Sequence, residues 1–385
     1  MTFRFSRSHQ EALHTCPRLA WLRYYDRGHG WESTKLDLHR ATGSLVHSIN
    51  QRILTFCLNN DTIPSAELVD GYVAAAVDDY KAEAQERGVN IEEMGDLLFE
   101  LTRQSALAEA LCRAWVRVRL PDILAKFKVI AVEQEWDVPL DPEGTICIMV
   151  RLDALLERRD DKDLWVLEEK TTGWMSEDWL ESFRYSSQTL QQVWAVEQHM
   201  KRPCGGVLVE ALYKGIKRSD DSGKVTYYSP LIRGYIKKGI PPFDEDELSW
   251  DSANARRKGW EPCDVWQWGK TRDWVALLPT EVLTAQLFSR EVFRSGSEQE
   301  QWARQTLAEQ RRLSGAVASL ADPTHADVHD AIMALDFPAR LNADCYSNKY
   351  RQRCPMLQVC FSGLDPADSE EFRPREPHHL QERDD

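Results

Sequence analysis

The sequence predicts an α/β protein in which a mixed central β-sheet is flanked by helices. Apolar runs of strand length, separated by turn residues, lie between residues 129 and 171. Segments with apolar residues three and four positions apart precede and follow these runs, as is typical of helices. A further buried strand is predicted at 205–212. The resulting order of helix, three strands, helix and strand predicts the mixed sheet.

Two helices are predicted at the start of the chain, at 8–25 and 41–58. The pattern from 65 to 119 is also helical, with a break at 87–90, and we interpret it as an inserted helical subdomain that ends at Pro121. The sheet strands are then expected at 129–139, 146–157 and 164–171.

The later part of the chain is predicted to be more irregular. Residues 225–236 are expected to form a hairpin extension of the sheet, 241–279 a polar and loop-like segment, and 280–320 a pair of helices. The loop-like segment carries Trp250, Trp260, Trp266, Trp268 and Trp274. These side chains either stack on bases of single-stranded DNA or pin the loop to the core. Packing is favoured, because most tryptophan in globular proteins is packed.

The composition sets bounds on the class of protein. A chain of 385 residues with 42% hydrophobic content can bury a large core, as one elaborated domain or two intimately packed ones. The net charge of −14 argues against a general nucleic-acid coat, since phosphate contacts need clustered Lys and Arg. Local basic clusters exist, for example at Arg113, Arg117, Arg119, Lys126 and Lys128. The acidic, proline-containing segment 363–385 is expected to be disordered.

Two neighbouring strands carry a candidate catalytic cluster. Glu168 and Lys170 alternate with Glu169 along a predicted strand, so Glu168 and Lys170 project to one side and Glu169 to the other. Asp153 follows the apolar run 146–150, and a turn brings the two strands together as a hairpin. Two carboxylates can hold Mg²⁺ and a nucleophilic water beside a phosphate, with an amine nearby. The alternative is a solvated strand face with salt-bridging charges.

These residues, with His47 in Gly43-Ser44-Leu45-Val46-His47 and with Gln188, resemble the PD-(D/E)xK nuclease superfamily, in particular its RecB-like exonuclease branch. The resemblance implies a restriction-endonuclease-like core. It also implies that His47, Asp153 and Glu168 bind Mg²⁺ or Mn²⁺, that Lys170 orients the attacking water, and that Gln188 anchors the last helix of the site. The family usually has Tyr four residues after this Gln, where the present sequence has Gln192. Gln191 is therefore an alternative to Gln188.

Four cysteines form a second candidate site. Cys16 is followed by Pro17 and Arg18 near one end, and Cys345, Cys354 and Cys360 are grouped near the other. These settings resemble RecB-like nucleases that bind a [4Fe–4S] cluster, such as the B subunit of the AddAB helicase–nuclease and the CRISPR-adaptation exonucleases. Zinc is the alternative, although the spacings are wider than in most structural zinc sites. The remaining cysteines considered are interpreted as buried free thiols: Cys57, Cys112, Cys147 and Cys204.

Together these patterns predict a metal-dependent DNA nuclease, acting as an exonuclease on single-stranded or frayed DNA ends. The alternative is a catalytically silent iron–sulfur subunit that binds DNA within a recombination, replication or CRISPR assembly. The expected partners are DNA and a separate helicase or other recombination or CRISPR protein. No signal peptide or membrane-spanning run is visible, so a cytoplasmic location without membrane contact is expected.

The expected organisation has six regions. They are 1–58 with the first cluster cysteine and the His motif, the helical insert 59–128, the nuclease core 129–240, the Trp-rich loop and helices 241–340, the cysteine cluster 341–362, and the acidic tail 363–385.

Overall fold

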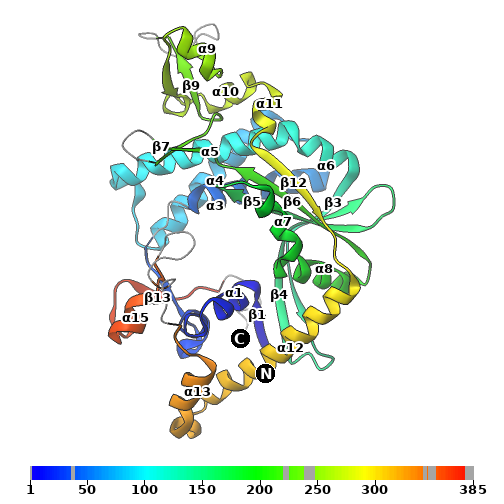
Figure 1. The fold of residues 1–385 in the computed structure, drawn as a ribbon, viewed down its shortest axis with the longest axis vertical. Helices are drawn as coiled ribbons and strands as arrows, with labels where there is room; N and C mark the ends of the chain where they lie inside the picture. Colours follow the sequence, from blue (N-terminus) through cyan, green and yellow to red (C-terminus); the bar gives the residue numbers. More distant parts are fainter. Residues whose placement is uncertain are drawn as a thin grey trace.

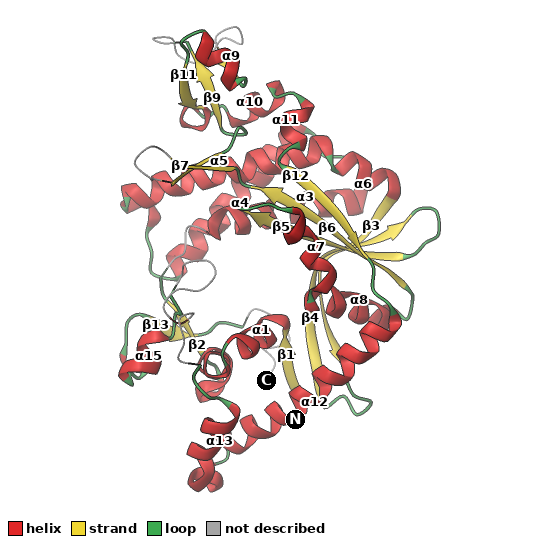
Figure 2. Ribbon diagram, in the orientation of Figure 1, coloured by secondary structure: helices red, strands yellow, loops and turns green. Residues whose placement is uncertain are grey.

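A computed structural model describes residues 2–35, 40–219, 225–237, 248–340, 345 and 353–377. It is built on a six-stranded mixed sheet with helices on both faces, which confirms the predicted α/β class (Figures 1 and 2). The strands run in the order β1-β4-β5-β6-β12, and β3 also pairs with β4. Their bounds are β1 (Phe3–Ser6), β3 (Phe127–Pro139), β4 (Ile146–Arg158), β5 (Leu164–Thr172), β6 (Cys204–Tyr213) and β12 (Leu287–Val292).

The strand directions are mixed in the way the sequence predicted. β1 is parallel to β4 and β5 is parallel to β6, whereas the β3–β4, β4–β5 and β6–β12 pairs are antiparallel. β1 was not predicted, and neither was β12. The latter lies within 280–320, so the prediction of only helices there was wrong: α11 (Thr280–Thr284) and α12 (Gly296–Ala321) flank a strand whose ends, Leu287 and Val292, are buried.

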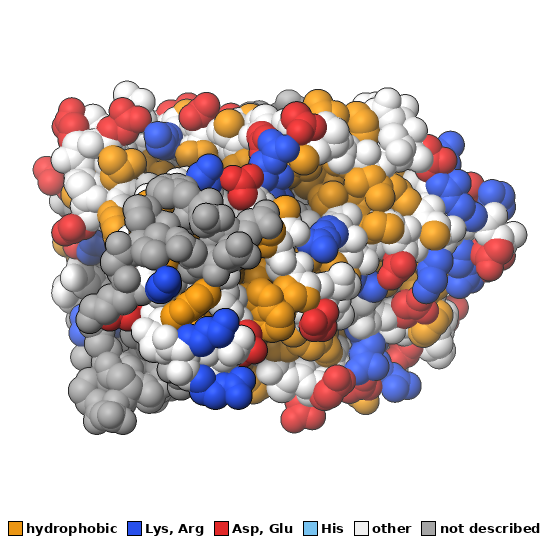
Figure 3. All heavy atoms as spheres, turned by 90° about the horizontal axis from the view of Figure 1, so that it is seen from above, with side chains coloured by type: hydrophobic (Ala, Val, Ile, Leu, Met, Phe, Trp, Pro, Cys, Tyr) orange, Lys and Arg blue, Asp and Glu red, His pale blue; other side chains and the backbone are white. Residues whose placement is uncertain are grey.

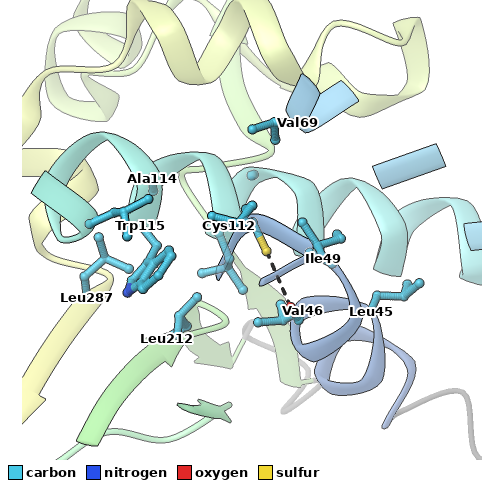
Figure 4. Packing of buried hydrophobic residues seen from close by; sticks show 14 of the residues in the cluster. Leu45, Val46, Ile49, Val69, Cys112, Ala114, Trp115, Leu212 and Leu287 are labelled. Atoms are coloured by element: carbon cyan, nitrogen blue, oxygen red, sulfur yellow. Dashed lines mark hydrogen bonds between the residues drawn. The ribbon is translucent and has the colours of Figure 1, made fainter. Parts of the chain in front are cut away.

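One face of the sheet is covered by four helices: α3 (Ala41–Asn60), α4 (Ala66–Glu86), α5 (Gly95–Val118) and α6 (Leu120–Lys126). Figure 4 shows Val46 and Ile49 of α3 beside Cys112 and Trp115 of α5, with Leu212 of β6 close by. All five side chains are buried. The predicted helical insert therefore packs on the sheet and forms a major part of the core, and Cys112 is a buried free thiol as expected.

The opposite face is covered by α8 (Ser187–Met200) and α12. Trp194 of α8 meets Trp302 of α12 edge to face, with 5.6 Å between ring centroids. Both helices begin at serine caps. Ser186 accepts from the backbone of Gln188, and Ser295 forms a capping box with Glu298. These caps set the first turn of α8, where a predicted site residue lies.

The two ends of the described chain pack together in a third apolar cluster. The predicted helix at 8–25 is divided at Cys16, whose extended backbone precedes Pro17, into α1 (Arg7–Thr15), α2 (Pro17–Ala20) and η1 (Trp21–Tyr25). Trp21 contacts Phe337, which follows α13 (His329–Asp336), at 5.0 Å between centroids. Late in the chain, α15 (Leu357–Ser362) packs against the same cluster.

The segment from 363 was expected to be disordered, and for residues 363–377 this was wrong. β13 (Phe372–Pro374) pairs antiparallel with β2 (Trp31–Ser33), and the Phe372 side chain is buried in the third cluster. Burial of this aromatic ring outweighs the acidic, proline-containing composition around it. Residues 378–385 lie outside the described part of the chain.

The Trp-rich segment is not simply a loop. β10 (Leu248–Ser249) and β11 (Glu261–Asp264) flank β9 (Arg233–Ile236) in a small separate sheet, joined by α9 (Ser252–Arg257), η7 (Val265–Trp268) and α10 (Thr271–Leu277). Trp266 and Trp274 are buried, and Nε1 of Trp274 donates to the carbonyl of Pro230 (3.0 Å). For these two residues the packing interpretation is confirmed. β8 (Val225–Tyr228) is a strand, as predicted, and pairs antiparallel with β7 (Ile216–Ser219) in a two-stranded sheet of its own.

A buried ion pair joins the helical layer to the sheet and gives a test of the fold. Arg119 donates to both oxygens of Glu210 on β6 (2.9 and 3.1 Å), and Glu210 is 1% exposed. Arg119→Ala leaves this carboxylate without its cation, so the free energy of unfolding should fall by about 3–5 kcal/mol in urea titrations. Arg103→Ala is the control, because its pair with Glu100 is half exposed and should contribute less than about 1 kcal/mol. Equal losses in both variants would contradict the role given to Arg119.

Candidate active site

The candidate site lies where β4 and β5 separate. The ladder between these strands ends at Ala154 opposite Leu167, so Asp153 and Glu168 are the first residues beyond it. Past this point β4 pairs with β1 at residues 146–149. The backbone N–H of Glu169 donates to Oδ2 of Asp153 (2.8 Å) across the opening. The two carboxylates predicted to act together are therefore brought together at the fork between β4 and β5.

Glu168 is buried and surrounded by donors. Lys170 forms an ion pair with Oε1, as expected for side chains two positions apart on a strand. Nε2 of Gln188 donates to Oε1 and Nε2 of Gln192 donates to Oε2. Burial acts to raise the pKa of Glu168, but the charge of Lys170 and these hydrogen bonds outweigh it and hold the pKa below its ordinary value. Glu168 is thus kept as a carboxylate.

Helix α8 supplies both glutamines because residues four positions apart share one face of a helix. Gln188 therefore lies at the site, as predicted, and the geometry favours it over its rival Gln191. Gln192 was noted only as a departure from the family pattern, yet it binds the same carboxylate. The signal for Gln192 was its position, one helical turn after Gln188.

His47 reaches the site from α3. Its Nδ1 lies 3.8 Å from Oδ1 of Asp153. The helix can lie this close to β5 because Gly43 has no side chain: a Cβ there would be 3.0 Å from Oγ1 of Thr171. The predicted spacing of Gly43 and His47 thus has a physical basis. Gly43 allows α3 to lie close to β5, and His47, one helical turn later, can therefore reach Asp153.

Glu169 points to the α3 side of the sheet, away from Glu168, as the strand alternation predicted. It is buried, and Nδ2 of Asn50 donates to its Oε1 (2.9 Å). Burial and the nearby Asp153 raise the pKa of Glu169 well above its ordinary value, which favours the neutral acid. The pKa of Asp153 is also raised, by burial and by Glu168, against the opposing effect of His47 and Lys170. Asn50 was not found from the sequence.

Glu133 is a third carboxylate near the fork. It lies on β3 between Val132, which pairs with Ala154, and Gln134, which pairs with Leu152, and so stands across from Asp153. Its φ of 48° interrupts the extended strand. Burial and the charge of Asp153 raise the pKa of Glu133 to about 7. Glu133 was not found from the sequence, because no local pattern reveals the irregular backbone at this position.

The chemistry of the site fits a hydrated divalent cation. Asp153 and Glu168 disfavour each other's charged form, and acceptor oxygens of Asn50, Gln188 and Gln192 are buried without a donor. A cation would reduce the repulsion between the two carboxylates, and its bound waters would donate to the unpaired amide oxygens. Within the described residues, however, no set of three or more His, Cys, Asp or Glu side chains already converges as it would around a metal ion.

The four predicted cluster cysteines also lie near one another. The backbone N–H of Cys354 donates to the carbonyl of Cys345 (2.8 Å). Burial raises the pKa of the Cys360 thiol to about 11, and Cys354, Cys16 and Cys345 add to the effect. The pKa of Cys354 is raised by burial and by Cys345 and Cys16. Thiols from both ends of the chain are thus close enough to influence one another, as the resemblance implied.

A comparison with protein families identifies the chain. The family model of the PD-(D/E)XK nuclease superfamily matches residues 4–361. The chain belongs to the PD-(D/E)XK nuclease superfamily. The matched range includes the fork, α8 and all four cysteines of the second site, and membership supports a metal-dependent nuclease. No curated protein gives a significant match to the chain.

Three arginines of the first expected basic cluster are engaged within the protein. Arg113 pairs with Asp70 and Glu109, Arg117 donates to backbone carbonyls at 275–278, and Arg119 binds Glu210. On the face seen in Figure 3, Lys and Arg side chains are interspersed with Asp and Glu. In the described ranges, no helix is long and apolar enough to cross a bilayer.

Proposed function

We propose that this protein is a metal-dependent deoxyribonuclease that hydrolyses phosphodiester bonds at the fork between β4 and β5. The observation that carries the proposal is the placement of Asp153 and Glu168 at one point, with Lys170 on the same side and two glutamines fixing Glu168. This is the arrangement of groups that metal-assisted phosphate hydrolysis requires.

Each residue has a defined role in this proposal. Asp153, Glu168 and His47 would hold Mg²⁺ or Mn²⁺, which would lower the pKa of a bound water and neutralise phosphate charge. Lys170 orients the attacking water and stabilises the charge that develops on the phosphate. Gln188 and Gln192 hold the Glu168 carboxylate in one orientation, and Glu133 stands across from Asp153 as a further carboxylate beside the reacting groups.

The finer assignment is an exonuclease on single-stranded or frayed DNA ends, working in the cytoplasm beside a helicase or another DNA repair, recombination or CRISPR protein. It rests on the resemblance to the RecB-like branch. We further infer that Cys16, Cys345, Cys354 and Cys360 bind a [4Fe–4S] cluster. This inference rests on the resemblance and on the effect that these thiols have on the pKa values of Cys354 and Cys360, since a cluster of this kind takes four cysteine ligands.

The test is cleavage of end-labelled DNA by protein purified without oxygen. Single-stranded oligonucleotides should be shortened from an end in Mg²⁺ or Mn²⁺, and EDTA should stop the reaction. An internally labelled circular single strand, which has no ends, is the matched control and should stay intact. Binding without cleavage in either metal would favour a catalytically silent DNA-binding subunit instead.

A further inference from the structure

Two exposed aromatic side chains border the fork. Trp174 lies four residues after Lys170, just past the end of β5, and Tyr185 lies three residues before Gln188. Their side chains are 64% and 76% exposed. An extended chain spans at most about 3.6 Å per residue, so each backbone lies within roughly 11–14 Å of a residue that binds Glu168. Large aromatic side chains are usually buried, so two at the edge of one site need a reason.

The turn that presents Tyr185 is held rigidly from behind. The side chain of Arg294 is buried, and its guanidinium donates to the carbonyls of Phe183 (3.1 Å) and Ser186 (2.9 Å) and to Oγ1 of Thr189 (2.6 Å). A buried arginine that binds backbone on both sides of Tyr185 fixes this turn, while the ring itself faces solvent. Burying a guanidinium costs free energy unless its donors are satisfied, and here the donors of Arg294 are satisfied by the turn that carries Tyr185.

Trp174 is presented in a similar way. Its backbone N–H donates to Oγ1 of Thr172 (3.1 Å), and this hydroxyl donates back to the carbonyl of Trp174. The turn after β5 is therefore closed by its own threonine, and the indole extends from it into solvent. In both residues the backbone is held by hydrogen bonds of its turn, whereas the aromatic ring is exposed to solvent.

The surroundings suit a nucleic-acid strand. Arg184, next to Tyr185, has a 68% exposed side chain, and its Nη1 lies 3.4 Å from Oε1 of Glu181. Glu177 of the intervening helix α7 (Glu177–Glu181) is paired with Arg290, which reduces its repulsion of phosphate. A polar cavity of about 360 Å³, lined by Arg7, His14, Ser186 and Ser187 among others, lies directly beside the Tyr185 turn. A base could stack on the aromatic ring while the adjoining sugar–phosphate lies in the polar cavity.

We propose that Trp174 and Tyr185 are base-stacking positions that guide single-stranded DNA to the fork between β4 and β5. This inference rests on the proposed nuclease function and adds the residues that position its substrate: two aromatic rings that stack on the accessible base faces of unpaired nucleotides. It also separates the stacking role from the Trp-rich segment, where Trp266 and Trp274 are buried.

The test is binding of a labelled 20-nucleotide poly-dT strand to the full chain, measured by fluorescence anisotropy in EDTA so that no cleavage occurs. Trp174→Ala and Tyr185→Ala should each weaken binding roughly 5- to 100-fold. Trp174→Phe and Tyr185→Phe should retain most of the affinity, because a ring remains. Trp268→Ala is the matched control, since this tryptophan is also exposed but lies in the small separate sheet, and its affinity should equal that of the unaltered protein.

A 20-mer of abasic sugar–phosphate units distinguishes stacking from charge. The unaltered protein should prefer poly-dT to the abasic strand, and the Trp174→Ala/Tyr185→Ala variant should lose this preference. A preference that survives in the double variant would overturn the inference while leaving the nuclease proposal intact. Failure of the unaltered protein to bind or cleave any DNA would instead overturn the proposed function. Unchanged melting temperatures would show that the variants report on binding and not on folding.

Discussion

Glu168→Ala and Asp153→Ala should each reduce DNA cleavage by on the order of 10³-fold or more. Metal ions contribute several kcal/mol to the stabilisation of a phosphoryl transition state, and about 4 kcal/mol corresponds to a thousandfold change in rate. Glu168 also anchors Lys170, Gln188 and Gln192, so its loss disorganises the remaining groups at the fork. Initial rates with end-labelled single strands in Mg²⁺ and in Mn²⁺ give the measurement.

Lys170→Ala separates metal binding from chemistry. It should lose activity to a similar degree while Mn²⁺ still binds, as measured by calorimetry, because its amine is not a ligand. Glu291→Ala, which removes an exposed carboxylate from β12, is the control and should keep the rate of the unaltered protein. If Asp153→Ala and Glu168→Ala both cleaved DNA as fast as the unaltered protein, the fork would not be the active site.

Replacement of any one of Cys16, Cys345, Cys354 and Cys360 by serine should yield a colourless, aggregation-prone protein without nuclease activity. The catalytic residues are untouched in these variants, so the loss would come from the fold. Thiolate ligation couples metal binding to folding, and a centre that joins residues more than three hundred positions apart restricts the unfolded chain strongly. Iron content and visible absorbance of anaerobically purified protein give the measurement.

Cys204→Ala is the matched control for the cysteine variants. This thiol is buried beside β5 and is remote in sequence from the four, so iron and activity should both be retained. One equivalent of zinc in place of iron would indicate a four-cysteine zinc site. Protein that contains no metal and still folds would contradict a metal centre at these residues.

The sequence predicted the parts of the fold that have strong local patterns. β3, β4, β5, β6 and helix α3 were found within a few residues, because each carries a clear apolar pattern of strand or helix type. β1 and β12 were missed because strands of four and six residues are too short to show a period. Their identity as strands depends on β4 and β6, which are distant in sequence.

The positions of the candidate site residues could be predicted where these residues lie on strands or helices with a clear apolar pattern. Asp153, Glu168 and Lys170 were placed together because strand alternation and a hairpin determine their geometry. Glu133 and Asn50 were not found, since their contacts depend on a backbone irregularity and on the packing of α3 against β5. The roles of His47, Asp153, Glu168, Lys170 and Gln188 in catalysis and metal binding stay predictions.

The pairing of β1 with β4 has a consequence for how the protein is made. Phe3 leaves the ribosome 143 residues before its partner Ile146. At translation rates of about 5–20 residues per second, β1 waits roughly 7–29 s for that partner. β2 waits much longer for β13, since Ser33 pairs with Phe372. Nascent chains therefore carry unpaired strands for most of their synthesis, and production at low temperature with abundant chaperones should raise the yield of soluble protein.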